Sequence, residues 1–287
     1  MDPTAPPSAA LAMAADVLII GAGPAGLSLA CALADAGMTV RLLEQQPRAA
    51  LDEPPEDGRE IALTHRARHV MQTLGLWDHL PPREIAPLRE ARVLDGDRSA
   101  ALRFAPPDLG QPGAEPLGWL VPNHLIRRAA LAAACSRPGV QLQCDARVDA
   151  LSLDETRAEL TLADGQRLAA PLVVAADSRL SRTRTLAGIG ASMRDFGRVV
   201  IVARIAHERP NDGIAWECFR YGNTLALLPM NDRQASAVVT LPSDQAPLWL
   251  GLSDADFAAR IEAQSGGRLG AVRMVGARHH YPLELVR

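Results

Sequence analysis

The sequence predicts an α/β fold in which a doubly wound (Rossmann-like) domain is interleaved with an antiparallel β-sheet domain. Three observations predict this class. A glycine-rich turn lies between two apolar runs near the start of the chain, a later apolar run ends on an acidic residue, and closely spaced short strands follow from residue 195 onward. Strands that alternate with helices are typical of a parallel sheet, whereas successive strands joined by tight turns are typical of an antiparallel one.

Residues 16–44 predict a strand, a helix and a second strand, in that order. Val17–Ile20 is a continuous apolar run, as expected for a parallel strand that is buried on both faces. Apolar residues recur at helical spacing over 27–34, and Gly37 marks the end of that helix. A second apolar strand covers 39–43 and ends on Glu44.

The turn between the first strand and the helix fits the pattern G-x-G-x-x-G. Gly21 allows the tight turn, Gly23 lets the backbone approach a pyrophosphate, and Gly26 lets the helix pack closely on the strand. The free N–H groups at the start of the helix favour bound phosphate. The expected cofactor contacts in this turn are Gly21, Gly23, Pro24, Ala25 and Gly26.

Glu44 completes the pattern of a dinucleotide site. It follows Gly26 by eighteen residues, where an acidic side chain can accept hydrogen bonds from an adenosine ribose. A carboxylate at this position disfavours a ribose 2′-phosphate, which argues against NADP. The residues leave FAD and NAD as alternatives.

Two later segments each contain one candidate cofactor residue. Residues 57–74 predict a turn and then a helix capped by Thr64, with Arg59 in the loop before that helix. Residues 119–131 predict a strand that leads through Pro122 into an amphipathic helix, with Asn123 at its N-cap. Arg59 is either a solvated loop residue or a contact to a cofactor phosphate or ring edge. The Asn123 amide either caps the helix or reaches a ribityl hydroxyl.

Residues 172–184, LVVAADSRLSRTR, form the second acidic strand end. An apolar run leads to Asp177, and Arg179, Arg182 and Arg184 follow within seven positions. Taken alone, this pattern is typical of a strand that ends in a solvated loop. A carboxylate for cofactor hydroxyls and guanidinium groups for phosphates are the functional alternative.

Together these motifs resemble the FAD-dependent aromatic hydroxylases, which are single-component flavoprotein monooxygenases. The resemblance implies that the glycine-rich turn binds the ADP part of FAD and that Arg59 contacts the cofactor. It also implies a second fingerprint near FAD and the nicotinamide cofactor, formed by Asp177, Ser181 and Arg184. The chain departs from the family at Ser178, where glycine is usual, and a φ above zero there would strain a serine.

Four segments, GREIALTH, VVAADSRLSRTR, DFGR and ECFRYGNTLALLP, are similar to the ubiquinone-biosynthesis branch, most of all to the 5-demethoxyubiquinol hydroxylases. The resemblance implies FAD as cofactor, NAD(P)H as transient electron donor, and hydroxylation of an aromatic or polyprenylated quinol substrate by O₂. It also implies a ubiquinone-biosynthesis protein complex as partner. The flavin is then the reactive group, so no catalytic side chain is assigned. Family members continue with a Gly-Asp flavin segment, and we expect this chain to be truncated before it.

The antiparallel domain should contain strands over 199–205, 215–221, 224–230 and 235–241 and a helix over 254–264. Gly222-Asn223 suits a tight hairpin turn. Trp216, Phe219 and Tyr221 are candidate pocket residues, although packing in the sheet core is the alternative for each. We expect a disordered tail over 1–14, an FAD-binding domain over 15–84 and 118–190, and an interleaved antiparallel β-sheet substrate domain over 85–117 and 191–287.

The composition excludes several other classes. The net charge of −3 gives no reason to expect a nucleic-acid partner, and the absence of lysine excludes Schiff-base chemistry. The four cysteines lack zinc-site spacing, so we expect no metal. Without a basic leader or a long apolar span, the chain should be cytoplasmic, at most peripheral to a membrane. Two alternatives remain open: another flavin-dependent oxidoreductase on this scaffold, or an inactive interaction or scaffold protein.

Overall fold

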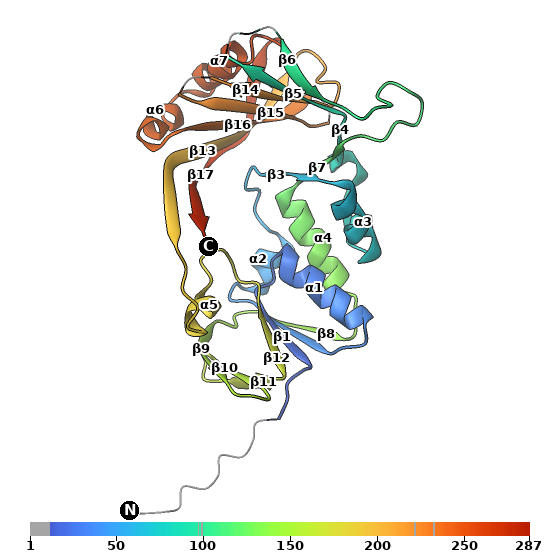
Figure 1. The fold of residues 1–287 in the computed structure, drawn as a ribbon, viewed down its shortest axis with the longest axis vertical. Helices are drawn as coiled ribbons and strands as arrows, with labels where there is room; N and C mark the ends of the chain where they lie inside the picture. Colours follow the sequence, from blue (N-terminus) through green and yellow to red (C-terminus); the bar gives the residue numbers. More distant parts are fainter. Residues whose placement is uncertain (1–11, 97, 99, 221, 232) are drawn as a thin grey trace, which may run out of the picture. The chain divides into compact units, whose positions relative to one another are not determined.

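The computed structural model describes residues 12–96, 98, 100–220, 222–231 and 233–287. The chain forms two compact units, each described here by itself (Figure 1). The first contains residues up to Pro54 and Ala130–Ala191, and the second contains Pro55–Ala129 and Ser192–Arg287. The units are defined by packing within the chain and not by bound ligands, so the functional domain boundaries expected from the sequence stay a prediction.

A four-stranded parallel sheet forms the centre of the first unit. Its order is β12-β1-β2-β8, and Ile20 at the end of β1 lies between Leu43 of β2 and Ala175 of β12. Every residue of β1 is buried, as the apolar run predicts. The elements are β1 (Val17–Ile20), α1 (Pro24–Asp35), β2 (Val40–Leu43), α2 (Arg48–Asp52), β8 (Val140–Gln143) and β12 (Leu172–Ala175).

A three-stranded antiparallel sheet packs against the parallel sheet in the same unit. Its order is β11-β10-β9, and Leu160 and Leu168 pack in one apolar cluster with Leu18 and Leu43 of the parallel sheet. Met13, which belongs to the predicted tail, forms a bridge with Ala169. The elements are β9 (Val148–Leu153), β10 (Ala158–Leu162), β11 (Arg167–Ala170) and the short helix α5 (Arg182–Leu186).

The second unit contains a seven-stranded sheet of order β17-β13-β16-β15-β14-β5-β6. Its neighbours are antiparallel, as predicted, except that β14 pairs with β5 in parallel. Gly222 has a φ of +100°, in keeping with a tight turn after β14. The strands are β5 (Glu90–Asp95), β6 (Ala101–Phe104), β13 (Met193–His207), β14 (Ile214–Phe219), β15 (Thr224–Pro229), β16 (Gln234–Pro242) and β17 (Val272–Val286).

Helices α6 (Ala246–Leu250) and α7 (Asp254–Gln264) cover one face of this sheet through Trp249, Phe257 and Ile261. Trp216, a candidate pocket residue, packs against this core between Arg92 and Arg268, whose guanidinium carbons lie 5.0 and 4.9 Å from its ring centroid. Phe219, the second candidate, is 49% exposed. Tyr221, the third, lies outside the described residues.

A small antiparallel sheet of order β3-β7-β4 completes the second unit. The Thr64 hydroxyl accepts a hydrogen bond from the Ala67 N–H and caps the helix that follows, as predicted. On that helix Met71 is buried, whereas Val70 is 45% exposed. The elements are β3 (Glu60–Leu63), α3 (His65–Thr73), η1 (Trp77–His79), η2 (Pro82–Glu84), β4 (Ala86–Leu88), β7 (Gly118–Pro122) and η3 (Ser243–Gln245). Helix α4 (Asn123–Cys135) begins in the second unit, and its residues from Ala130 onward belong to the first.

Candidate functional site

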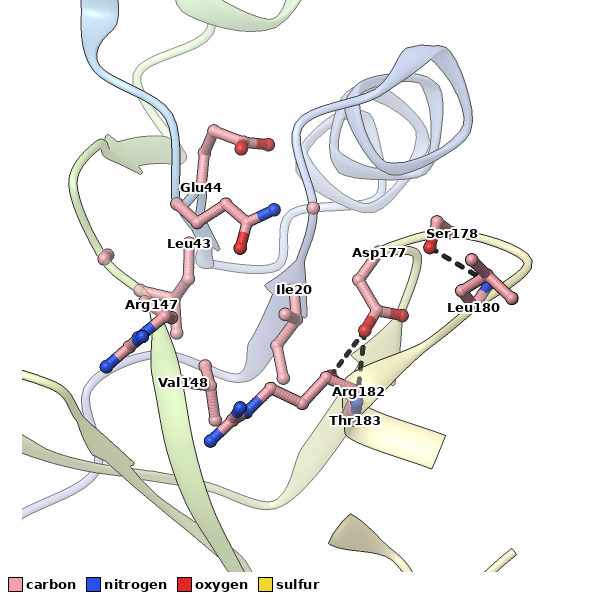
Figure 2. A pocket seen from close by; sticks show the side chains of 13 residues that line it. Ile20, Leu43, Glu44, Arg147, Val148, Asp177, Ser178, Leu180, Arg182 and Thr183 are labelled. Atoms are coloured by element: carbon pink, nitrogen blue, oxygen red, sulfur yellow. Dashed lines mark hydrogen bonds between the residues drawn. The ribbon is translucent and has the colours of Figure 1, made fainter. Parts of the chain in front are cut away.

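A cavity of about 260 Å³ lies in the first unit, at the carboxyl ends of β1 and β2 (Figure 2). This edge of an open parallel sheet is where such folds bind their ligands. The glycine-rich turn, the acidic end of β2 and the loop after β12 all contribute to its wall. The lining residues are Ile20, Gly21, Leu43, Glu44, Gln45, Ala146, Arg147, Val148, Asp177, Ser178, Leu180, Arg182 and Thr183.

The three glycines of the turn differ in what surrounds them. Gly21 has a φ of +105°, and a Cβ there would lie 2.5 Å from the carbonyl oxygen of Ala176. A Cβ on Gly26 would lie 2.1 Å from the carbonyl oxygen of Gly21. A Cβ on Gly23 would meet no described atom within 4 Å. Packing within the chain therefore requires glycine at the first and third positions, whereas the space beside Gly23 is open to a ligand.

Helix α1 begins directly after Gly23 and presents its N-terminus at this turn. Gly23 is the N-cap and has no side chain to cap the helix, while Pro24 at the first helical position carries no N–H. The N–H groups of Ala25 and Gly26 come too early in the helix to have an intrahelical acceptor. They can donate to an anion, which the helix dipole also favours.

Glu44 lies at the end of β2 and is held by two backbone groups. Its Oε2 accepts a hydrogen bond from the Ala22 N–H at 2.8 Å, and its Oε1 accepts one from the Gln46 N–H at 2.9 Å. The carboxylate thus bridges the glycine-rich turn and the loop after β2. Each oxygen keeps a second lone pair that can accept a ribose hydroxyl.

Asp177 follows β12 and organises the loop that carries the second fingerprint. Its Oδ2 accepts hydrogen bonds from both the N–H and the hydroxyl of Thr183, each at 3.1 Å. Burial raises the pKa of Asp177, but hydrogen bonds from Ser181 and Thr183 outweigh this effect and hold it below its ordinary value. The carboxylate is therefore ionised at neutral pH. Ser181 caps α5 by accepting a hydrogen bond from the Arg184 N–H at 2.9 Å.

Ser178, where the family usually has glycine, is accommodated without backbone strain. It is not among the described non-glycine residues with positive φ, and its hydroxyl accepts a hydrogen bond from the Leu180 N–H at 3.2 Å. Serine at this position therefore fits the loop.

The arginines of this loop point in different directions. Arg184 donates from its guanidinium to the carbonyl oxygen of Arg179 at 3.1 Å and does not line the cavity. Arg182 does line it, together with Arg147, which the sequence did not single out. Both are ion-paired with Asp149, at 3.2 Å in each case. Arg147 precedes β9 and stands in no recognisable motif, so only the fold brings it to the cavity.

The second unit brings Arg59 and Asn123 together around Asp57. The carboxylate of Asp57 accepts hydrogen bonds from the Arg59 Nε at 3.0 Å and from the Asn123 Nδ2 at 2.7 Å. The Tyr281 hydroxyl donates to the Asp57 carbonyl oxygen at 2.5 Å, and the Arg59 guanidinium carbon lies 5.5 Å from the Tyr281 ring centroid. Burial raises the pKa of Asp57, but the hydrogen bonds from Arg59 and Asn123 bring it below its ordinary value. Sequence reasoning assigned Asp57 only to a turn.

A parallel sheet with a glycine-rich turn, an acid at the end of the next strand and a cavity between them defines the class of dinucleotide-binding α/β proteins. Comparison with known proteins gives the particular family: the chain belongs to the FAD binding domain family, whose model matches residues 14–278. The resemblance to FAD-dependent hydroxylases is thereby confirmed. The match also decides between FAD and NAD, in favour of FAD.

The curated relatives of the chain include two ubiquinone hydroxylases. The chain is 43% identical over 275 residues to ubiquinone hydroxylase UbiM of Neisseria meningitidis, covering 95% of this chain and 59% of the relative. It is 38% identical over 282 residues to ubiquinone hydroxylase UbiL of Rhodospirillum rubrum, covering 98% and 65%. The chain thus spans less than two thirds of the length of these two relatives.

Solved structures share the fold at lower identity. PqsL of Pseudomonas aeruginosa has a TM-score of 0.71 and 22% identity, over 91% of this chain and 73% of that one. The Diels-Alderase PyrE3 has a TM-score of 0.65 and 20% identity, over 94% and 56%. None of the helices in the described part of the chain combines the length and apolar composition that a bilayer crossing requires.

Proposed function

We propose that the chain is the FAD- and substrate-binding part of a monooxygenase that uses NAD(P)H and O₂ to hydroxylate an electron-rich aromatic or quinol ring in ubiquinone biosynthesis. The observation that carries the proposal is the meeting of both fingerprints at one cavity, which Gly21, Glu44 and Asp177 all line. The 43% identity to ubiquinone hydroxylase UbiM supports the choice of pathway.

The residues of the first unit fit the ADP half of FAD. Gly23 leaves room beside the backbone, and the N–H groups of Ala25 and Gly26 can donate to the pyrophosphate. Glu44 accepts hydrogen bonds from the ribose hydroxyls, and the ionised Asp177 accepts them from hydroxyls farther along the cofactor. Backbone donors already hold both carboxylates, so little ordering is required when the ligand binds.

In the second unit, Asp57 prepares Arg59 and Asn123 for the rest of the cofactor. It restrains the Arg59 guanidinium and the Asn123 amide through hydrogen bonds. Arg59 then donates to the cofactor edge or a phosphate, and Asn123 binds a ribityl hydroxyl. The seven-stranded sheet supplies the surface on which the ring substrate is oriented and kept from water.

FAD, when bound, supplies the redox chemistry, and the chain binds and orients the reactants. In the overall reaction NAD(P)H provides two electrons, one oxygen atom of O₂ enters the ring, and the other leaves as water with one proton taken from solvent. We further propose a polyprenylated quinol as substrate and a ubiquinone-biosynthesis complex as partner. The four cysteines are free, which fits a cytoplasmic, membrane-peripheral setting.

A combined binding and product experiment tests the function. The purified chain is titrated with FAD, reduced anaerobically with NADH or NADPH with and without a short-chain demethoxyubiquinol, and then given O₂. We expect FAD binding, substrate-stimulated reduction and a product with one added oxygen atom by mass spectrometry. Because the same fold occurs in a Diels-Alderase, FAD binding without a hydroxylated product would favour another flavin-dependent reaction. Failure to bind any flavin would favour a scaffold role.

A further inference from the structure

The walls of the nucleotide cavity differ in charge. Glu44 and Asp177 lie toward the glycine-rich turn, and the guanidinium groups of Arg147 and Arg182 lie on the side away from it (Figure 2). In the proposed function, the two carboxylates accept hydrogen bonds from hydroxyl groups of the cofactor. Neither arginine belongs to the glycine-rich motif or to the fingerprint residues Asp177, Ser181 and Arg184.

Asp149 holds both arginines in place. Its Oδ1 lies 3.2 Å from the Arg147 Nε and 3.2 Å from an Arg182 terminal nitrogen, and its Oδ2 accepts a hydrogen bond from Arg147 at 3.2 Å. The Arg147 and Arg182 side chains are 56% and 59% exposed, so without this partner they would sample many rotamers. The shared carboxylate reduces the entropy that a ligand must otherwise offset.

The part of the cavity beside the arginines is apolar at its base. Ile20 is 7% exposed, Val148 is 5% exposed and Leu43 is fully buried, and all three line the cavity. An apolar base beside planar guanidinium groups suits a flat aromatic ring, because guanidinium stacks on aromatic faces. A ribose bound at Glu44 would place its attached adenine ring in this region of the cavity.

We propose that Arg147 and Arg182, positioned by Asp149, form the base-binding wall of the cavity and determine its preference for an adenosine-bearing flavin over FMN. This inference rests on the proposed binding of FAD. A phosphate is the other ligand that two arginines could bind. It fits less well, since Asp149 leaves the cluster with a net charge of only about +1 and the Glu44 carboxylate lines the same cavity.

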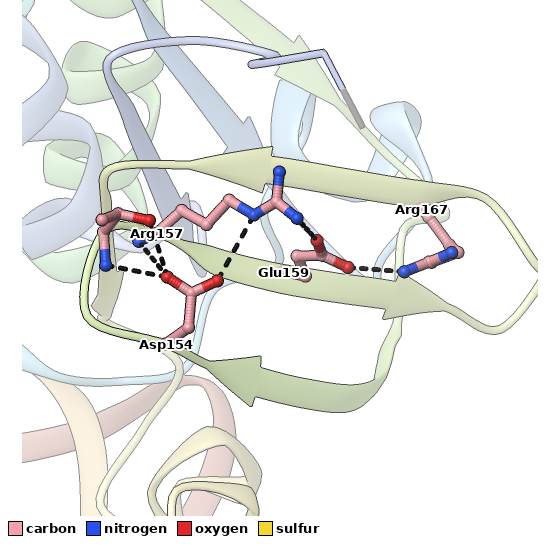
Figure 3. A network of polar contacts seen from close by, with 5 residues as sticks. Asp154, Arg157, Glu159 and Arg167 are labelled. Carbon is pink, nitrogen blue, oxygen red and sulfur yellow. Dashed lines mark hydrogen bonds and ion pairs between the residues drawn. The ribbon is translucent and has the colours of Figure 1, made fainter. Parts of the chain in front are cut away.

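A neighbouring ion-pair network provides the matched control. Arg157 and Arg167 pair with Glu159, at 2.7 and 2.5 Å, on the same three-stranded sheet (Figure 3). Arg167 is 50% exposed, close to the exposure of the cavity arginines, and it does not line the cavity. Arg167→Ala therefore removes a comparable ion-paired arginine without touching the proposed wall.

The experiment measures the affinities of ADP, FAD, FMN and adenosine 2′,5′-bisphosphate for the chain by titration calorimetry. Arg147→Ala and Arg182→Ala should each weaken ADP and FAD by a factor on the order of 3 to 30, and FMN by less than about twofold. Asp149→Asn should produce a smaller loss with the same pattern, and Arg167→Ala should leave all four affinities unchanged. Melting temperatures show that each variant is folded.

Three outcomes would overturn the inference. The first is an unchanged ADP affinity in the Arg147→Ala, Arg182→Ala double variant. The second is a loss of FMN affinity equal to the loss of FAD affinity. The third is adenosine 2′,5′-bisphosphate binding more tightly than ADP only while both arginines are present. The last outcome would indicate a phosphate clamp. If the wild-type chain binds ADP but not FAD, the proposed function fails, and the ADP measurements still decide the role of the arginines.

Discussion

Single residues in the glycine-rich turn have separable structural and ligand-binding roles. Gly21 and Gly26 are required by neighbouring backbone atoms, which a Cβ would approach to 2.5 and 2.1 Å. Gly23 faces open space, so its lack of a side chain matters only to something that binds there. A motif that looks uniform in sequence therefore contains two packing positions and one binding position.

Alanine at Gly26 should affect the stability of the chain, whereas alanine at Gly23 should affect its affinity for FAD. Gly26→Ala should lower the free energy of unfolding by about 1–3 kcal/mol, because the turn must shift to admit the Cβ. Gly23→Ala should leave that free energy within about 0.5 kcal/mol but weaken FAD by at least about tenfold. Urea denaturation and FAD titration measure the two effects. An FAD affinity equal to wild type in Gly23→Ala would show that the FAD pyrophosphate does not pass close to this residue.

Asp177 has a close structural counterpart in Asp154. Each accepts hydrogen bonds from the N–H and the hydroxyl of one threonine, Thr183 and Thr156 respectively. Asp177→Asn should cost about 1 kcal/mol of stability, because a charge-assisted acceptor in a half-buried loop is lost, whereas Asp154→Asn, at an exposed position, should have a smaller effect. Only Asp177→Asn should also weaken FAD, by about tenfold. Equal FAD affinities in the two variants would mean that Asp177 has only a structural role.

At the scale of elements, short segments set the direction of the functional side chains. Helix α5 begins at Arg182, and residues two positions apart in a helix point about 200° apart. Arg182 therefore faces the cavity while Arg184 turns back to the carbonyl of Arg179. The resemblance implied Arg184 as the cofactor residue, and its part in binding remains a prediction.

The edge hairpin of β5 and β6 depends on the buried carboxylate of Glu90. Hydrogen bonds from Arg92 and Arg103 lower the pKa of Glu90 from 4.5 to about 2. Because the folded pKa is the lower one, the stabilisation is complete above pH 4.5 and is lost as the pH falls toward 2. Glu90→Gln should lower stability by about 1–3 kcal/mol at pH 7, with a smaller difference at pH 3. Denaturation curves at both pH values measure this, and a difference independent of pH would contradict it.

On the scale of the whole molecule, the proposed cofactor residues belong to two compact units. The glycine-rich turn, Glu44 and Asp177 belong to the first unit, whereas Arg59 and Asn123 belong to the second. The cavity is lined by the first unit alone. ADP, which corresponds to one half of FAD, should therefore need only the first unit.

ADP should protect one unit selectively. At 100 times its dissociation constant, a ligand stabilises the fold that binds it by about 2.7 kcal/mol. Hydrogen exchange should slow in segments of Ala15–Pro54 and Ala130–Ala191 and stay unchanged in the seven-stranded sheet of the second unit. FAD should slow exchange also around Arg59 and Asn123. Protection of the second unit by ADP alone would place the nucleotide elsewhere.

Much of the first unit could be predicted from the sequence, because its signals are local. The strand-turn-helix-strand order over 16–44 is encoded by apolar runs, by glycines at positions of special geometry and by an acid at a strand end. Where prediction went wrong, packing decided. Strand β14 paired in parallel with β5, a segment more than a hundred residues earlier.

By itself, the sequence determined the fold class, the nucleotide turn and the family motifs, since these depend on backbone conformation and periodicity over short stretches of chain. Only the tertiary structure decided which charged groups meet. Asp57 joins Tyr281 across 224 positions, and Asp149 brings Arg182 beside Arg147 at the cavity. No local pattern records such contacts, because they arise when segments that are separate in the sequence pack together in the fold.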